Sequence, residues 1–237
     1  MLICIGVFAF SAYNLFQIYY GKHQVEEETE NLEKHVVKED KNKKVLSVDW
    51  DSLKAENSQI VAWIYVPDCE ISFPVVQGED NNYYLKHTTN GEYNERGAIF
   101  LDCEANSGFT DDNSIIYGHS VEGGGMFSLL KNFADSDFFS SHSVFYLLTP
   151  SCNYKCDVFA FSKTTEDSVF YTTSYGDYKD SVIQNMKTES TYVNELDVEG
   201  SMVTLSTCDL DYGFNSTHRL VLSGILHKSE DEIVLED

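Results

Sequence analysis

The sequence of 237 residues is poor in arginine, in proline and in positive charge. Only Arg96 and Arg219 are arginines, and 39 acidic residues against 16 basic ones give a formal net charge of −23. A surface of this charge repels phosphate backbones, which argues against nucleic acid as a partner. Three prolines are too few for a collagen-like or proline-rich disordered chain.

The cysteines lack the spacing of a metal site. None of the six belongs to a Cys-x-x-Cys pair, so no zinc site is expected. The closest couple, Cys152 and Cys156, could form a hairpin disulfide in an extracytoplasmic domain. A domain of about 190 residues needs no such cross-link, however, and we expect both thiols to be free.

The amino-terminal segment predicts a membrane anchor. Residues 2–20 carry no charge, and a helix of that length spans about 30 Å, the thickness of the bilayer hydrocarbon. A cleaved signal peptide would require a small-x-small cleavage site, and none follows. A buried helix would not account for the polar residues after it. We therefore expect a single transmembrane helix at 1–21, a solvated stalk at 22–45 and a folded domain at 46–237.

The domain has the pattern of a mostly β protein. Aromatic residues make up 14% of the chain, and such side chains suit pleated, half-buried strands. Strands are predicted at 60–67, 71–77, 97–102, 113–120, 144–149, 154–164, 202–208 and 218–226. Helices or helical turns are predicted at 49–57, 80–87, 126–135 and 177–190. About eight strands without βαβ alternation indicate a closed barrel or a sandwich.

Three side chains at strand ends could act together. Cys208 ends the apolar run VTLSTC, and His119 follows the short strand that contains IIY. Arg219 opens the last strand, so antiparallel pairing with 202–208 would bring it to the rim that holds the thiol. A cysteine can act as nucleophile, a histidine can protonate a leaving amine, and an arginine can bind an oxyanion.

These motifs resemble the sortase family. TLSTC with a strand-opening arginine and an upstream YGHS is similar to the sortase signature. The ordered segments IVAWIYVP, ISFPVVQGEDNNYYL, GAIFLD and GGMFSLLKNF resemble class B sortases. The resemblance implies an eight-stranded sortase β-barrel with N-terminal helices and a helix between the sixth and seventh strands. It also implies that Cys208 is the nucleophile, His119 the acid and base, and Arg219 the residue that binds the oxyanion.

The same resemblance implies a substrate, a location and further site residues. Asn81, Leu85, Ser206 and Asp209 match positions that line the sorting-peptide site of class B enzymes. The implied enzyme is a membrane-anchored cysteine transpeptidase on the extracellular face of a Gram-positive bacterium. It would cleave the sorting motif of a surface protein after Thr and join that protein to a peptidoglycan cross-peptide amine. No metal or organic cofactor is implied, since class B members lack the calcium site of class A.

Several alternatives are compatible with these residues. A pilin-polymerising sortase would use a lysine amine as acceptor, and a hydrolytic cysteine peptidase would use water. A non-enzymatic surface binding domain would leave the cysteine, histidine and arginine without a shared role. Asp209 or Asp211 could orient His119. Strand alternation should turn His218 away from Arg219.

Overall fold

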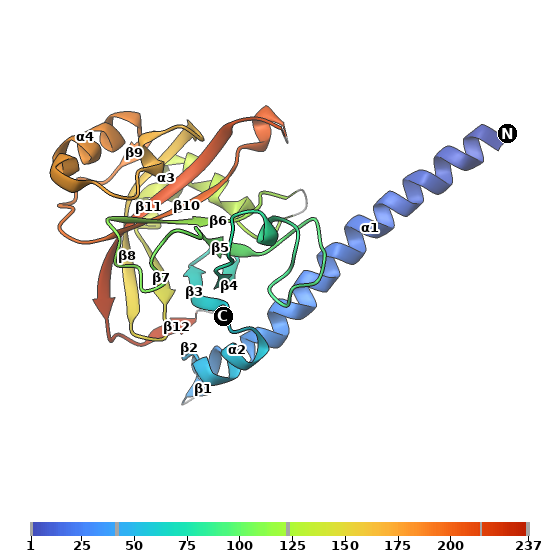
Figure 1. Cartoon of the computed structure of the whole chain (residues 1–237), viewed down its shortest axis with the longest axis horizontal. Helices are drawn as coiled ribbons and strands as arrows, with labels where there is room; N and C mark the ends of the chain where they lie inside the picture. Colours follow the sequence, from blue (N-terminus) through green and yellow to red (C-terminus); the bar gives the residue numbers. More distant parts are fainter. Residues whose placement is uncertain (1, 41–42, 122–123, 214, 236–237) are drawn as a thin grey trace.

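The computed structural model describes residues 2–40, 43–121, 124–213 and 215–235. Its body is a β-barrel in which strands neighbour one another in the order β11-β10-β6-β5-β4-β3-β7-β8, and β11 closes the ring on β8 (Figure 1). The strands are β3 (Ile60–Val66), β4 (Ile71–Val76), β5 (Ile99–Leu101), β6 (Asn113–Tyr117), β7 (Val144–Leu148), β8 (Asn153–Thr165), β10 (Met202–Cys208) and β11 (His218–Ser229). The eight predicted strands and the mostly β barrel are confirmed.

Helical segments connect the strands and cover the barrel. Asp49 caps α2 (Trp50–Glu56) by accepting a hydrogen bond from the Ser52 N–H. The run predicted as one helix at 126–135 is a 3-10 helix, η2 (Ser128–Ala134), and Asp135 caps a separate helix after it, α3 (Ser136–Ser141). Helix α4 (Lys179–Glu189) lies between β8 and β10, where the resemblance placed one. The other short elements are η1 (Tyr83–Leu85), η3 (Val169–Tyr171), η4 (Gly176–Tyr178), β9 (Tyr192–Val193) and η5 (Leu210–Tyr212).

The two faces of β10 pack against different cores. Val203 and Leu205 belong to the apolar cluster inside the barrel. Met202 belongs to a second cluster, which includes Met186 of α4 and covers the outer face. Because side chains alternate along a strand, Cys208 lies on the outer face with Met202.

The chain begins with one helix, α1 (Leu2–Glu33), whose first half extends away from the barrel (Figure 1). Its large apolar and aromatic side chains from Ile5 to Tyr20 are exposed. Among the residues with a described placement, no helix has both the length and the apolarity needed to cross a membrane. The predicted transmembrane span is therefore not supported by the structure.

The prediction of a solvated stalk at 22–45 is wrong for several of its residues. Leu32 and Val36 are 2% and 0% exposed, and both pack in a core cluster with Trp63. Strand β2 (Lys43–Leu46) pairs with β1 (Val37–Asp40) on one side and with β12 (Ile233–Leu235) near the carboxyl end of the chain on the other. The sequence concealed this packing because Leu32 and Val36 are two of the few apolar residues in a stretch dominated by charged side chains.

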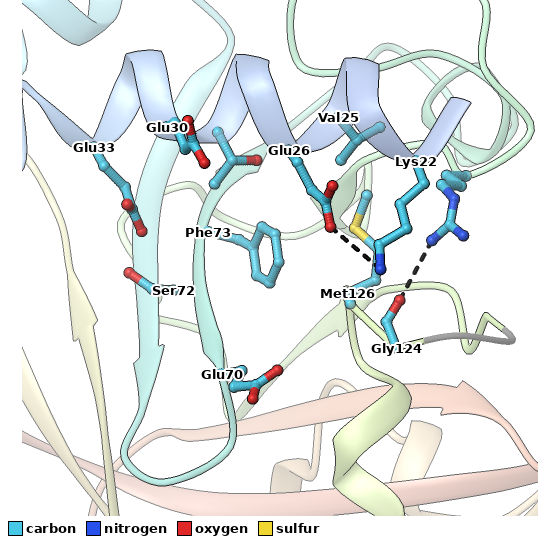
Figure 2. Close-up of a pocket in the computed structure, with 13 residues that line it drawn as sticks. Lys22, Val25, Glu26, Glu30, Glu33, Glu70, Ser72, Phe73, Gly124 and Met126 are labelled. Atoms are coloured by element: carbon cyan, nitrogen blue, oxygen red, sulfur yellow. Dashed lines mark hydrogen bonds and ion pairs between the residues drawn. The ribbon is translucent and has the colours of Figure 1, made fainter. Parts of the chain in front are cut away.

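The second half of α1 is fixed to the barrel by polar contacts. The Asn94 side chain donates to the Gly21 carbonyl at 2.9 Å, and the Asn90 N–H donates to the Glu28 carboxylate at 2.9 Å. Burial raises the pKa of Glu28 and of Glu33. A cavity of about 380 Å³ remains between α1 and β4, and Figure 2 shows the glutamates of α1 lining it opposite Ser72 and Phe73.

Shortening the chain tests this packing. A chain that begins at residue 45 loses Leu32 and Val36, and each buried side chain contributes about 1.5–3 kcal/mol to stability. We expect this chain to melt well below the full chain or to fail to fold. A chain that begins at residue 21 keeps the buried part of α1 and should melt close to the full chain. Equal melting temperatures for all three, measured by circular dichroism, would contradict the assignment of α1 to the folded unit.

Candidate active site

Cys208 and Arg219 are direct neighbours across two strands. Strands β10 and β11 are antiparallel, and their register pairs Cys208 with Arg219. Paired residues of antiparallel strands project from the same face, with Cβ atoms about 4.5–5.5 Å apart. The rim geometry predicted for the thiol and the guanidinium is therefore present.

His119 follows β6, which is the other neighbour of β10. Strand β6 runs parallel to β10, its Tyr117 pairs with Ser206, and the Gly118 N–H donates to the Ser206 carbonyl at 3.1 Å. His119 therefore follows β6 at the level of Cys208. A side chain at position 118 would bring its Cβ within 2.6 Å of the Phe127 ring, so this approach of the chain requires glycine.

A main-chain carbonyl holds the imidazole. His119 Nε2 lies 2.9 Å from the carbonyl oxygen of Leu85. The Asp209 carboxylate instead caps η5 by accepting the Asp211 N–H at 3.1 Å, and Asp211 lies 4.0 Å from the Lys163 amine. We considered Asp209 or Asp211 as the residue that orients His119. The structure shows that the Leu85 carbonyl makes this contact instead.

The Arg219 guanidinium contacts three oxygen atoms. Nη1 donates to the carbonyls of Ser216 and His218 at 2.8 and 2.9 Å, and Nη2 donates to the Glu166 carboxylate at 3.0 Å. The Arg219 side chain is 21% exposed. Such a fork has a fixed orientation beside Cys208, which a flexible ammonium would not have.

Two hydroxyl groups lie beneath the thiol. Ser206 Oγ and Tyr171 Oη are 2.6 Å apart, and Ser206 is 2% exposed. Burial raises the pKa of Tyr171, while its bond to Ser206 and the positive charge of Arg219 act in the opposite direction. The phenol therefore stays neutral and can serve as a donor. Sequence reasoning missed Tyr171 because it comes from a connection far from the motifs.

The predicted substrate-binding residues occupy different surroundings. Asn81 bonds within the protein, to the Asp102 carboxylate at 3.0 Å and to the Cys103 N–H at 2.8 Å, and Tyr117 donates to the same carboxylate. The Leu85 side chain is exposed. Burial, followed by the Asp102 charge, raises the pKa of Tyr117. A chain of hydrogen bonds thus links Asn81, through Asp102, to Tyr117 at the end of the strand that precedes His119.

Asp209 and His218 flank the segment that joins β10 to β11. Asp209 is 4% exposed, and its Oδ2 has no hydrogen-bond partner within the described ranges. The His218 ring stacks on Tyr212, with ring centroids 3.7 Å apart.

Across the described part of the chain, no three histidine, cysteine or acidic side chains gather into a possible metal site. The six cysteines, Cys152 and Cys156 included, are free.

Comparison with known proteins identifies the family. The family model of the sortase domain matches residues 64–227. This chain belongs to the sortase family. It is 32% identical to sortase B of Listeria monocytogenes over 233 residues, which are 95% of this chain and 94% of that protein.

Solved sortases have the same fold. The crystal structure of sortase B from B. anthracis matches with a TM-score of 0.77 and 28% identity, over 89% of this chain and 100% of that one. A class B sortase of Streptococcus pyogenes involved in pilus biogenesis matches with a TM-score of 0.68 and 32% identity, over 76% of this chain and 98% of that one. The sortase described here is accordingly a class B sortase and a cysteine transpeptidase.

Proposed function

We propose that Cys208, His119 and Arg219 carry out the transpeptidation. The observation that supports this most directly is the pairing of Cys208 with Arg219 at the ends of β10 and β11, while His119 follows β6, the other neighbour of β10. The substrate is the carboxy-terminal sorting motif of a surface protein, cleaved after Thr. Asn81, Leu85, Ser206 and Asp209 line its site.

The first half-reaction forms a thioester. The Cys208 thiolate attacks the Thr carbonyl carbon, and the carbonyl electrons move to the oxygen, where Arg219 donates hydrogen bonds to the resulting oxyanion. The carbonyl then re-forms and the carbon–nitrogen bond breaks. The His119 imidazolium gives its proton to the leaving amine. The products are a thioacyl enzyme, a neutral His119 and the released tail.

The second half-reaction uses an amine from a peptidoglycan cross-peptide. The amine nitrogen attacks the thioester carbon and gives a proton to His119, and the carbon–sulfur bond breaks. Both the thiolate and the imidazolium are thereby restored. This cycle joins the surface protein to the wall of a Gram-positive cell envelope.

Product analysis separates acyl transfer from hydrolysis. The full chain is incubated with internally quenched peptides that have Thr fixed before the scissile bond, with and without triglycine. We expect a Thr–triglycine product whose yield increases with triglycine concentration. Free Thr carboxylate as the sole product under both conditions would indicate a hydrolytic peptidase. The absence of any cleavage across the peptide pool would favour a binding domain.

Pilin polymerisation is a second candidate, supported by the likeness to the S. pyogenes enzyme. In that case the acceptor is a lysine side chain rather than a peptide amino terminus. Replacing triglycine with an acetylated peptide that contains one lysine distinguishes the two. A faster transfer to lysine than to triglycine would assign the sortase to pilus assembly.

We further propose that α1 attaches the sortase to a membrane. Large apolar and aromatic side chains between Ile5 and Tyr20 of α1 are exposed, among them Phe8, Phe10 and Phe16, and exposed groups of this kind partition into lipid. In flotation with phosphatidylglycerol–phosphatidylcholine vesicles, the full chain should float and a chain that begins at residue 21 should not. Equal behaviour of the two chains would contradict the attachment.

A further inference from the structure

We propose that Glu166 is a positioning residue for Arg219, whose carboxylate sets the orientation in which the guanidinium meets the reacting carbonyl. Glu166 immediately follows β8, and its Oε2 lies 3.0 Å from Arg219 Nη2. The inference rests on the oxyanion role proposed above for Arg219. It adds a residue that neither the motifs nor the strand register suggested.

The contact between Glu166 and Arg219 determines which N–H groups of the guanidinium face the substrate. A guanidinium has five N–H groups in one plane. Nη1 contacts two carbonyls, those of Ser216 and His218, and Nη2 contacts Glu166. Within the described residues, the second Nη2 hydrogen and the Nε hydrogen have no partner, and both can donate to a substrate oxygen. Both carbonyls accept hydrogen bonds from Nη1. The contact of Glu166 with Nη2 is therefore the one that sets the direction in which the Nε hydrogen and the second Nη2 hydrogen point.

Glu166 is itself attached to the loop that it serves. Its N–H donates to the Thr217 carbonyl at 3.0 Å, and the neighbouring register pairs Thr164 with Arg219. The carboxylate therefore approaches Arg219 from a backbone that is hydrogen-bonded to the segment supplying the two carbonyls. A free surface side chain would have no such fixed approach.

The ion pair between Glu166 and Arg219 contributes little to the stability of the fold. The Glu166 side chain is 56% exposed, and exposed ion pairs contribute about 0–1 kcal/mol to stability. Its effect should therefore appear in turnover. A misplaced catalytic group can cost about 10²-fold in rate, so we expect partial loss of orientation to cost on the order of 10-fold.

Single substitutions in the full chain test this effect. For the best substrate of the quenched Thr peptide pool, Glu166→Ala should lower kcat on the order of 10-fold and leave KM and the melting temperature nearly unchanged. Glu166→Gln retains an acceptor oxygen and should keep more of the activity than Glu166→Ala. Asp167→Asn is the matched control, since it removes the same charge one residue further on. It should leave kcat unchanged.

A double-mutant cycle with Arg219→Lys determines whether Glu166 acts through the arginine. In the lysine background, Glu166→Ala should cause no further loss, because the fork that it positions is absent. Independent losses that multiply would overturn the proposal, as would unchanged or faster turnover in Glu166→Ala. If Cys208→Ala and Arg219→Ala abolish cleavage while Glu166→Ala has the same kcat as the unsubstituted chain, the proposed function stands and the positioning role alone fails.

Discussion

Replacing Cys208 with alanine is expected to abolish peptide cleavage and leave the fold intact. The thiol lies at the end of β10 and is the nucleophile of the proposed mechanism, so without it the remaining groups have no nucleophile to assist. Removing a catalytic nucleophile costs about 10⁶-fold in a well-studied protease, and we expect a loss of at least about 10³-fold here. Cleavage rate and near-ultraviolet circular dichroism are measured on the same samples.

The other thiols provide the control. Cys152 lies at the turn between β7 and β8, away from the site, and Cys152→Ala should cleave at the rate of the unsubstituted chain. Burial raises the pKa of Cys69 to about 12 and that of Cys156 well above its ordinary value, so both should resist alkylation at neutral pH. Activity of Cys208→Ala above a trace would show that another group is the nucleophile.

Arg219→Lys is expected to lose on the order of 10²-fold in kcat/KM, which is the scale of a lost oxyanion donor. A lysine keeps the positive charge, but a single ammonium cannot reproduce the planar contacts to Ser216, His218 and Glu166 and still present donors to the substrate. Arg219→Ala should be at least as slow. The measurement is kcat/KM on one peptide, together with the rate of Cys208 alkylation by iodoacetamide from pH 5 to 9.

The second arginine is the matched control for this substitution. Arg96 Nη1 donates to the Gly124 carbonyl at 3.3 Å, close to α1, and Arg96→Lys should cleave peptide at a rate close to that of the unsubstituted chain. If Arg219→Lys is equally active, the role of Arg219 is only to supply positive charge, and its fork geometry does not matter. Normal alkylation combined with slow turnover would instead place the defect at the oxyanion.

The sequence was most informative for strands that are close in the chain and whose side chains alternate between the two faces of the sheet. The strand runs around Cys208 and Arg219 are apolar and separated by a short loop, so pairing and register followed from strand geometry. Strands β2 and β12 were missed because they pair segments from opposite ends of the chain, and β1, which pairs with β2, is short and mostly charged. Leu32 and Val36 are one helical turn apart, but the charged residues around them leave too few apolar positions to indicate a buried helix face.

The surroundings of the three catalytic candidates were harder to predict. Glu166 is one carboxylate among 39, and its contact with Arg219 depends on how β8 pairs with β11. The partner of His119 is a main-chain carbonyl, which every residue has, so no side-chain pattern could indicate Leu85. Tyr171 enters from the connection between β8 and α4. Each of these contacts depends on the closed barrel rather than on neighbouring residues.

The parallel pairing of β6 with β10 has a consequence for refolding. Tyr117 and Ser206 pair although roughly 90 residues separate them, and closing so long a loop delays the contact relative to hairpins such as β7–β8. Cys208 ends one of these two late-pairing strands, and His119 follows the other. After dilution from denaturant, secondary structure should therefore recover before enzymatic activity. An intermediate with native hairpins should be inactive, because β6 and β10 have not yet paired and His119 and Cys208 are still apart.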